Sequence, residues 1–386
     1  MPKHYLSQFD SLDTPFYFYD IGILRRTLKR VKEEIEGYPY HVHYALKANV
    51  NNRLLKEICE QGLGADCVSG NEVRKALEVG FPKSDIVFAG VGKTDKEIAL
   101  GLEAEIFAFN VESIQELEVL NAMAGEQQKK ARFALRLNPN VDAGTHEYIT
   151  TGKRNNKFGV TFEELSQAMP FIKQLEHLEF IGIHFHIGSQ ISDLGRFSAL
   201  ISKVNDIQDY LEEQGLNLPH LNVGGGLGID YTDPDGTPIP DFSSYFGRFK
   251  RELQLRAGQT LHFELGRSLV GQCGSLVTRV LYNKPGEGTT FLVVDAGMTE
   301  LLRPALYQAS HTIQNLSSER QGAAYDVVGP ICETSDAFAR GIELPESKRG
   351  DLLAIRSTGA YAEVMSSRYN LREVAPSVYS DDFVEV

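Results

Sequence analysis

The stretch YHVHYALKANVN, residues 40–51, begins as a β-strand and delivers a lysine at the point where that strand should end. Its side chains alternate between two faces, which is the period of a half-buried strand. Positions 41, 43 and 45 share one face, and positions 42, 44 and 46 share the other. Lysine is normally kept at the surface, because burying an ammonium group is costly unless the charge is paired or neutralised. Lys47 is therefore a candidate functional residue.

Short apolar segments of this kind recur along the chain. The eight candidate strands are residues 41–47, 64–69, 86–90, 106–110, 131–138, 180–187, 220–225 and 260–266. Most of the intervening stretches place apolar residues at helical spacing, as residues 51–62 and 111–125 do. Another begins at Thr161 with Glu164 three positions on, which is a capping-box pattern. The alternation predicts an α/β fold of the (β/α)8, TIM-like barrel class, although an open doubly wound sheet has a similar pattern.

The alternation of strands and helices ends after Arg267. Strand-like segments then follow one another across Gly/Pro turns, without helices between them, in residues 269–297, 323–330 and 350–358. We expect a second, mostly β domain, which the strand-like N-terminus could join. The expected domains are a barrel over residues 20–267 and a β domain over residues 1–19 and 268–386.

Composition restricts the possible partners and compartment. The 386 residues suit two domains, and 42% hydrophobic with 24% charged residues is typical of a globular protein. A net charge of −13 argues against a nucleic-acid or anionic-membrane surface. No apolar run reaches the roughly 20 residues of a membrane span, and the N-terminus lacks a signal-peptide pattern. Four cysteines without disulfide-scaffold or metal-site spacing favour a reducing cytoplasm, in which Cys332 could persist as a thiol.

Active sites of such barrels lie at the C-terminal ends of the strands. The residues at the predicted strand ends are Lys47, Asp66, Arg136, His186 with Ser189, Gly224–Gly226, and Glu264 with Arg267. Consecutive glycines leave backbone N–H groups open to an anion, and Arg267 adds a guanidinium beside them. Barrels often bind phosphate after strands 7 and 8, so we favour a phosphate site over a mere tight turn. The long polar segment 139–160, after the fifth strand, is expected to be a functional loop.

A lysine near a phosphate site suggests a Schiff base to a phosphorylated aldehyde, because the covalent bond removes the buried charge. Pyridoxal 5′-phosphate also needs a carboxylate at its pyridine nitrogen and a flat group against its ring. Glu264 can supply the carboxylate and His186 the flat group. For an isolated lysine, a surface side chain with a buried stem would be the simpler interpretation.

Two histidine pairs support a competing hypothesis. His41 with His43, and His184 with His186, are each spaced so that both side chains point to one face of a strand. Some metal-dependent hydrolase barrels take two zinc ligands from such a pair. That hypothesis leaves the glycines and Arg267 unexplained. For His41 and His43, which precede the strand end, we favour a structural role.

These residues lie in segments that resemble diaminopimelate decarboxylases, and the resemblance extends over nearly the whole chain. The segments are YALKAN (44–49), HEYITTGKRNNKFGV (146–160), HFHIGSQI (184–191), NVGGGLGIDY (222–231), ELGRS (264–268), VVDAGMTELLRPALYQA (293–309), GPICETSD (329–336) and STGAYAEVMSSRYN (357–370). KFGV, RPALY and GPICETSD are the parts more specific to this branch. The family belongs to the fold-type III pyridoxal-phosphate enzymes, so the resemblance implies an alanine-racemase-like barrel with a β domain.

The resemblance also implies how the cofactor, pyridoxal 5′-phosphate, is held. Lys47 would form the Schiff base, His186 would stack on the ring and Glu264 would take the pyridine nitrogen. Tyr361 would lie against the cofactor. The other implied cofactor-binding residues are Ser189, Gly224, Gly225, Gly226, Leu265, Gly266 and Arg267.

Substrate contacts are implied in the same way. Arg303 and Tyr307 would bind the carboxylate that is not cleaved, and Glu333 would bind the distal ammonium. Arg267 and Tyr361 would also reach the substrate. Cys332 is the candidate proton donor; in the family it comes from the partner subunit together with Glu333, which implies a homodimer.

The expected reaction is decarboxylation of meso-2,6-diaminopimelate to L-lysine and CO2, the last step of lysine biosynthesis. Within the class, the alternative is a fold-type III decarboxylase acting on carboxynorspermidine, arginine or ornithine. Outside it, the alternatives are the barrel metallohydrolase and a non-enzymatic pyridoxal-phosphate carrier. Such carriers resemble the barrel alone, whereas this chain continues through Arg303 and Cys332.

Overall fold

The computed structural model describes residues 5–141, 144 and 157–383. The chain forms two compact units. One comprises Leu28–Gly228 and Asp241–Gly266 and is called the barrel unit below. The other comprises Met1–Thr27, Ile229–Pro240 and Arg267–Val386 and is called the β unit. Most of the expected loop 139–160 lies outside the described residues.

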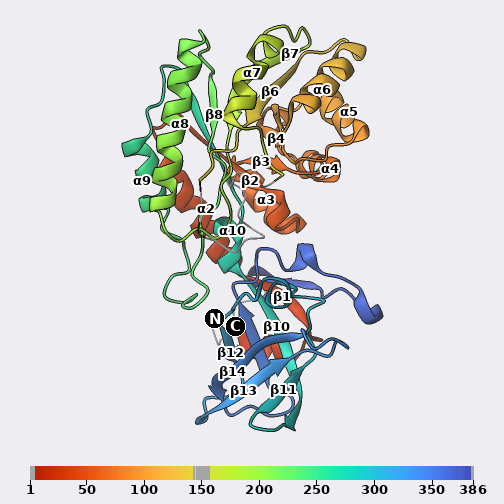
Figure 1. The fold of residues 1–386 in the computed structure, drawn as a ribbon. Helices are drawn as coiled ribbons and strands as arrows, with labels where there is room; N and C mark the ends of the chain where they lie inside the picture. Colours follow the sequence, from red (N-terminus) through yellow and green to blue (C-terminus); the bar gives the residue numbers. More distant parts are fainter. Residues whose placement is uncertain (1–4, 142–143, 145–156, 384–386) are drawn as a thin grey trace. The chain divides into compact units, whose positions relative to one another are not determined.

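The barrel unit contains a closed barrel of eight parallel strands (Figure 1). They are β2 (Tyr40–Ala45), β3 (Gly64–Cys67), β4 (Ile86–Phe88), β5 (Ala108–Val111), β6 (Ala131–Arg136), β7 (Leu178–His184), β8 (His220–Asn222) and β9 (Thr260–Leu265). Each strand pairs with the next, and β9 closes the barrel by pairing with β2. The predicted (β/α)8 barrel is confirmed, and the open doubly wound sheet is excluded.

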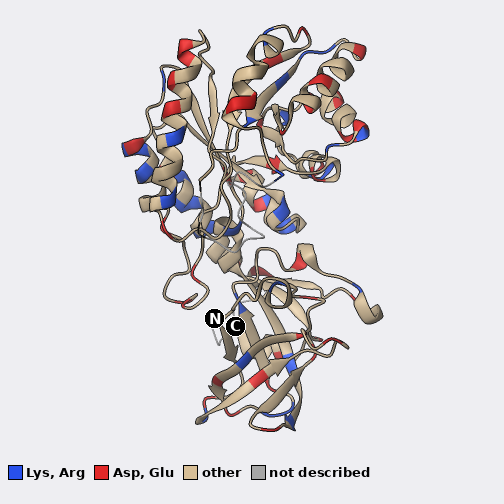
Figure 2. Cartoon of the chain, in the orientation of Figure 1, with Lys and Arg blue, Asp and Glu red and all other residues tan. Residues whose placement is uncertain are grey.

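Helices surround the strands on the outside of the barrel (Figure 1). They are α2 (Ile21–Ile35), which begins in the β unit, α3 (Asn52–Glu60), α4 (Gly70–Val79), α5 (Asp95–Ala104), α6 (Ile114–Glu126), α7 (Phe162–Ile172), α8 (Gly195–Glu213) and α9 (Phe242–Glu252). The predicted capping box starts α7, because Thr161 Oγ1 accepts from the Glu164 N–H at 3.2 Å and Glu164 Oε2 accepts from the Thr161 N–H at 2.7 Å. Figure 2 shows acidic and basic residues interspersed over the helices. In the described part of the chain, no helix has both the length and the apolar composition to span a membrane.

Three histidines form a hydrogen-bonded row inside the barrel. Nδ1 of His43 donates to the backbone oxygen of Asp85 at 3.0 Å, so its Nε2 accepts from Nδ1 of His262 at 2.9 Å. Nε2 of His262 then accepts from Nδ1 of His220 at 2.9 Å. Burial lowers the pKa of all three histidines, that of His43 to about 3, so the row is neutral at pH 7. These contacts are those of structural histidines, and no cluster of three or more His, Cys, Asp or Glu among the described residues could hold a metal ion.

The β unit is built on a mixed sheet with the strand order β12-β15-β10-β11-β13-β14. Its strands are β1 (Phe16–Tyr19), β10 (Gly274–Pro285), β11 (Thr290–Val294), β12 (Ile313–Asn315), β13 (Gly322–Val328), β14 (Ala337–Pro345), β15 (Leu352–Arg356) and β16 (Ser377–Tyr379). The N-terminal β1 pairs antiparallel with β10 and parallel with β16. Phe9, Phe16 and Phe18 pack with Val277 and Leu352 in its core. The predicted fold class, a barrel with a second, mostly β domain, is confirmed.

Candidate active site

Lys47 follows β2 in a short 3-10 turn, Leu46–Ala48, at the C-terminal end of the strand. Its Nζ lies 3.1 Å from Oδ2 of Asp66, on the neighbouring strand β3. The Asp66 side chain is fully buried, whereas 32% of the Lys47 side chain is exposed. Burial and the charge of Glu264 raise the pKa of Asp66 to about 6, although Lys47 opposes this increase. The lysine at the strand end is thus paired, and its amine remains partly accessible.

Glu264 lies on β9, which pairs with β2 on the side opposite β3. Its Oε1 accepts hydrogen bonds from Nδ2 of Asn110 at 3.0 Å and Nδ2 of Asn222 at 2.8 Å. Its Oε2 accepts from Nε2 of His184 at 3.0 Å. Burial alone would raise the pKa of Glu264, but His184 with its hydrogen bond, Lys47 and His186 bring that pKa below its ordinary range. The barrel therefore holds a buried, ionised carboxylate near Lys47.

His186 lies just beyond the end of β7, and its Nδ1 accepts a hydrogen bond from the backbone N–H of Gly225 at 3.3 Å. Desolvation and the positive charges of Lys47 and Arg136 bring the pKa of His186 well below its ordinary value. A neutral imidazole with Nδ1 as acceptor is a flat group of the kind required to stack on an aromatic ring.

Neighbouring backbone atoms leave no room for a side chain at Gly224, Gly225 or Gly226, the three glycines after β8. A Cβ atom at Gly224 would overlap the backbone oxygen of Phe185, and one at Gly225 would overlap that of Glu264. At Gly226 it would lie 2.6 Å from the backbone oxygen of Gly188, and the φ of +109° is left-handed. The tight turn thus explains the glycines without a ligand. The absence of side chains also leaves the backbone N–H groups of this turn open to an anion. The turn is therefore compatible with bound phosphate, but the same glycines would be needed without it.

Arg136, at the end of β6, forms a buried ion pair with Glu112. The same glutamate binds the backbone at the end of the expected loop 139–160. Its Nη1 donates to Oε1 of Glu112 at 2.6 Å, and Oε2 of Glu112 accepts from the backbone N–H of Gly159 at 2.9 Å. The guanidinium lies 4.7 Å from the ring centroid of Phe158. The KFGV motif is therefore attached to the C-terminal end of a barrel strand.

In the β unit, two buried arginines share one tyrosine. The guanidinium of Arg303 lies 4.7 Å from the ring of Tyr231, and Nη1 of Arg267 donates to the hydroxyl of the same tyrosine at 2.5 Å. The Arg267 guanidinium also lies 4.7 Å from the ring of Tyr361. Burial and the charge of Arg267 lower the pKa of Arg303. Two guanidinium groups held together by aromatic side chains form a site suited to a carboxylate or another anion.

The remaining predicted residues lie at different places in the β unit. Tyr307 ends the short helix α11 (Arg303–Tyr307). Cys332 and Glu333 are exposed between β13 and β14. The backbone N–H of Cys332 donates to Oδ1 of Asn370 at 3.2 Å, and Oε1 of Glu333 accepts from the hydroxyl of Tyr369 at 2.7 Å. The structure therefore groups Arg267, Arg303 and Tyr361, and it places Cys332 and Glu333 on an exposed connection against the C-terminal segment.

Several residues of these two groups were not identified from the sequence. Asn110 ends a predicted strand, as Lys47 does, and Asn222 lies within the predicted strand 220–225, but an amide at either place carries no specific signal. Asp66 was placed at a strand end without a role, and His184 was considered only as a metal ligand. Tyr231, and His311, which lies 2.7 Å from Nη1 of Arg303, are in connections whose side-chain directions depend on tertiary structure.

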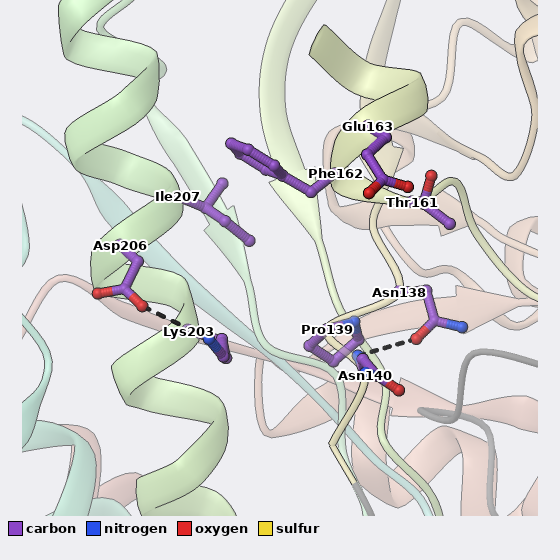
Figure 3. A pocket seen from close by; sticks show the side chains of 9 residues that line it. All are labelled: Asn138, Pro139, Asn140, Thr161, Phe162, Glu163, Lys203, Asp206 and Ile207. Atoms are coloured by element: carbon purple, nitrogen blue, oxygen red, sulfur yellow. Dashed lines mark hydrogen bonds and ion pairs between the residues drawn. The ribbon is translucent and has the colours of Figure 1, made fainter.

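A cavity of about 400 Å³ lies elsewhere on the barrel unit, between α8 and the start of α7 (Figure 3). It is lined at one end by Asn138–Asn140 and at the other by Thr161–Glu163, with Lys203, Asp206 and Ile207 from α8. These residues include none of the individual catalytic or binding residues predicted from the sequence, although Pro139 and Asn140 begin the expected loop 139–160. The cavity is distinct from the group around Lys47.

Comparisons with known proteins cover nearly the whole chain. Residues 21–271 match the family model described as pyridoxal-dependent decarboxylase, pyridoxal binding domain. A diaminopimelate decarboxylase of Bacteroides thetaiotaomicron is 54% identical over 380 residues, which are 98% of this chain and 98% of that protein. One from Aquifex aeolicus is 42% identical over 372 residues, 95% of this chain and 86% of that protein. The crystal structure of diaminopimelate decarboxylase from Helicobacter pylori complexed with L-lysine has a TM-score of 0.92 and 39% identity, covering 99% of this chain and 95% of that one.

Proposed function

The chain belongs to the diaminopimelate decarboxylases, a branch of the pyridoxal-dependent decarboxylases, and on that premise we propose that it converts meso-2,6-diaminopimelate to L-lysine and CO2 with Lys47 as the cofactor-binding residue. The observation that carries the proposal is the arrangement around Lys47. A partly exposed amine at the end of β2 lies between strands that carry Asp66 and the ionised Glu264. This chemistry fits pyridoxal 5′-phosphate, which requires an amine and a carboxylate.

Each part of the barrel group has a role toward this cofactor. When bound, pyridoxal 5′-phosphate supplies an electron sink for the negative charge left as CO2 departs. Lys47 would hold it covalently, with Asp66 fixing the position of Nζ. His186 would stack on the ring, and Glu264 would accept a hydrogen bond from the ring nitrogen. The remaining contacts are assigned to Ser189, Gly224, Gly225, Gly226, Leu265, Gly266, Arg267 and Tyr361.

The β unit supplies the groups that select the substrate. Arg303 and Tyr307 bind the carboxylate that is retained, and Glu333 binds the distal ammonium. Arg267 and Tyr361 contact the substrate as well. Ornithine lacks the distal carboxylate, so it would leave the buried Arg303 without its anion, which is a strong penalty.

The proposed proton donor is Cys332, acting as a general acid after CO2 is lost. The resemblance assigns Cys332 and Glu333 to the site of the partner subunit, so the proposed active form is a homodimer. Exposure of both residues between β13 and β14 supports this assignment. Four free cysteines among the described residues also support a reducing, cytoplasmic location.

The test combines a spectrum with a product assay. The purified protein should show the absorbance of bound pyridoxal phosphate and should release CO2 and lysine from meso-diaminopimelate faster than it acts on arginine, ornithine or carboxynorspermidine. Borohydride should fix the cofactor to the wild-type protein and not to Lys47→Ala. A faster reaction with another of these amino acids would refute the substrate, and an adduct in Lys47→Ala would refute the lysine.

A further inference from the structure

The Glu264 carboxylate, on β9, accepts hydrogen bonds from side chains on three other strands of the barrel. Asn110 comes from β5, His184 from β7 and Asn222 from β8, and their bonds are 3.0, 3.0 and 2.8 Å long. All four residues are at least 95% buried. A buried charge is tolerated only when it is hydrogen-bonded, so this convergence fixes both the charge and the orientation of the carboxylate.

A carboxylate has about four acceptor positions, two on each oxygen. The two amides use both positions on Oε1, and His184 uses one on Oε2. Among the described residues no further donor bonds to Glu264, so one position on Oε2 remains. Because amides are permanent donors, they favour the ionised carboxylate over its protonated form.

His184 reaches Glu264 through one of its two ring nitrogens. Its Nε2 donates to Glu264, and its buried Nδ1 has no hydrogen-bond partner among the described residues. The other titratable groups whose charges interact with Glu264 are Lys47, Asp66, His43, His186 and His262.

We propose that Asn110, Asn222 and His184 are positioning residues that keep Glu264 ionised and reserve one acceptor position on Oε2 for the protonated pyridine nitrogen of the cofactor. This inference rests on the proposed function, which assigns Glu264 to that nitrogen. Without the three donors the buried carboxyl would take up a proton or rotate. Protonation would remove the negative charge that keeps the ring nitrogen protonated and effective as an electron sink, and rotation would displace that charge from the nitrogen.

The test measures the ring nitrogen directly. Holoenzyme is prepared with pyridoxal phosphate labelled with 15N in the ring. The nitrogen signal is recorded for wild type, Glu264→Gln, Asn222→Leu, Asn110→Leu, His184→Leu and His184→Gln. We expect a protonated nitrogen in wild type and in His184→Gln, whose amide can replace the Nε2–H donor. The three leucine variants should shift toward the unprotonated signal and lose about ten- to a hundredfold in kcat, the effect of one hydrogen bond to a charged group, with KM changed less than kcat.

A second measurement needs no cofactor. In apoenzyme carrying 13C-labelled glutamate carboxyls, the Glu264 signal, assigned by its loss in Glu264→Gln, should titrate at higher pH in the leucine variants than in wild type. His41→Gln changes a barrel histidine that does not contact Glu264 and serves as the control for both measurements. Circular dichroism checks that each variant folds; because the donors lie on three strands, any one folded leucine variant suffices.

The outcomes separate this inference from the function on which it rests. If Glu264→Gln deprotonates the ring nitrogen but the folded leucine variants leave it protonated, the positioning role is wrong. If Glu264→Gln itself leaves the nitrogen protonated, the assignment of Glu264 in the proposed function is wrong.

Discussion

Nε2 of His311 accepts a hydrogen bond from Nη1 of Arg303 at 2.7 Å, because the opposite nitrogen, Nδ1, donates to the backbone oxygen of Arg356 at 2.8 Å. The backbone bond thus fixes the tautomer of His311. Burial and the charge of Arg303 lower the pKa of His311 to about 3, so it remains an acceptor at pH 7. The imidazole orients Arg303 without neutralising it, whereas a carboxylate in its place would compete with the substrate.

Replacing His311 with leucine should therefore weaken substrate binding more than chemistry. The guanidinium would lose one hydrogen bond and its fixed orientation, and we expect KM for diaminopimelate to rise about tenfold. Steady-state kinetics and the cofactor spectrum check this, and kcat and the absorbance should change little. His311→Gln, which retains an acceptor, is the matched control. An unchanged KM in a folded His311→Leu protein would contradict the positioning of Arg303.

Replacing Arg303 itself should impair substrate turnover without affecting cofactor binding. Arg303→Ala removes two or more charge-assisted hydrogen bonds to a carboxylate, so kcat/KM should fall about a thousandfold. The cofactor absorbance should remain, because Arg303 is assigned to the substrate alone. Arg303→Lys keeps the charge without the fork-shaped pair of donors and should give an intermediate loss. Loss of the absorbance in Arg303→Ala would refute the assignment.

The buried histidines predict acid sensitivity. His43 has a pKa of about 3 in the folded protein, against about 6.5 when unfolded, so between these values the unfolded chain binds more protons. Stability should fall as the pH drops below about 6.5, by up to about 1.4 kcal/mol per pH unit for this histidine. Asp66 has the opposite sign, because its raised pKa lets the folded state bind the proton first.

Urea unfolding of wild type and His43→Gln at pH 7.5, 6 and 5 separates the contribution of His43 to the free energy of unfolding from that of Asp66. The difference in unfolding free energy between the two proteins should be constant near pH 7.5 and should shift in favour of the variant at pH 5. Parallel pH profiles for the two proteins would show that His43 does not remain neutral in the folded state.

Much of the barrel could be predicted because each strand is a short apolar run bounded by polar residues, and because barrels place function at strand ends. Lys47 and Glu264 were identified in this way. Asn110 and Asn222 were not, because their importance depends on strands β5, β8 and β9 directing side chains to one point, which no local pattern encodes. His311 lies eight positions after Arg303, and only the fold of the β unit brings the two side chains together.

The glycine turn after β8 predicts a sharp steric effect. Gly225 does not have a positive φ, but a Cβ there would overlap the backbone oxygen of Glu264. Gly225→Ala should therefore displace β9 and reduce the free energy of unfolding by about 1–3 kcal/mol, with loss of cofactor affinity. Gly92→Ala, where an added Cβ meets nothing within 4 Å, is the control and should be near neutral. Equal stability of the two variants would show that the turn can relax.

The proposed dimer predicts complementation between two inactive variants. Lys47→Ala lacks the cofactor-binding amine and Cys332→Ala lacks the proton donor, so each should be nearly inactive alone. If Cys332 serves the partner's site, a mixed dimer contains one site with both substitutions and one site with neither.

Mixing the two variants under conditions that exchange subunits should then restore activity. With random exchange half of the dimers are mixed, and each has one intact site, so about a quarter of the wild-type activity should return. Sedimentation establishes the dimer, and a mixture of Lys47→Ala with Lys47→Ala,Cys332→Ala controls for exchange alone. If Cys332 served its own subunit, every site in the mixed dimer would carry one substitution and no activity would return.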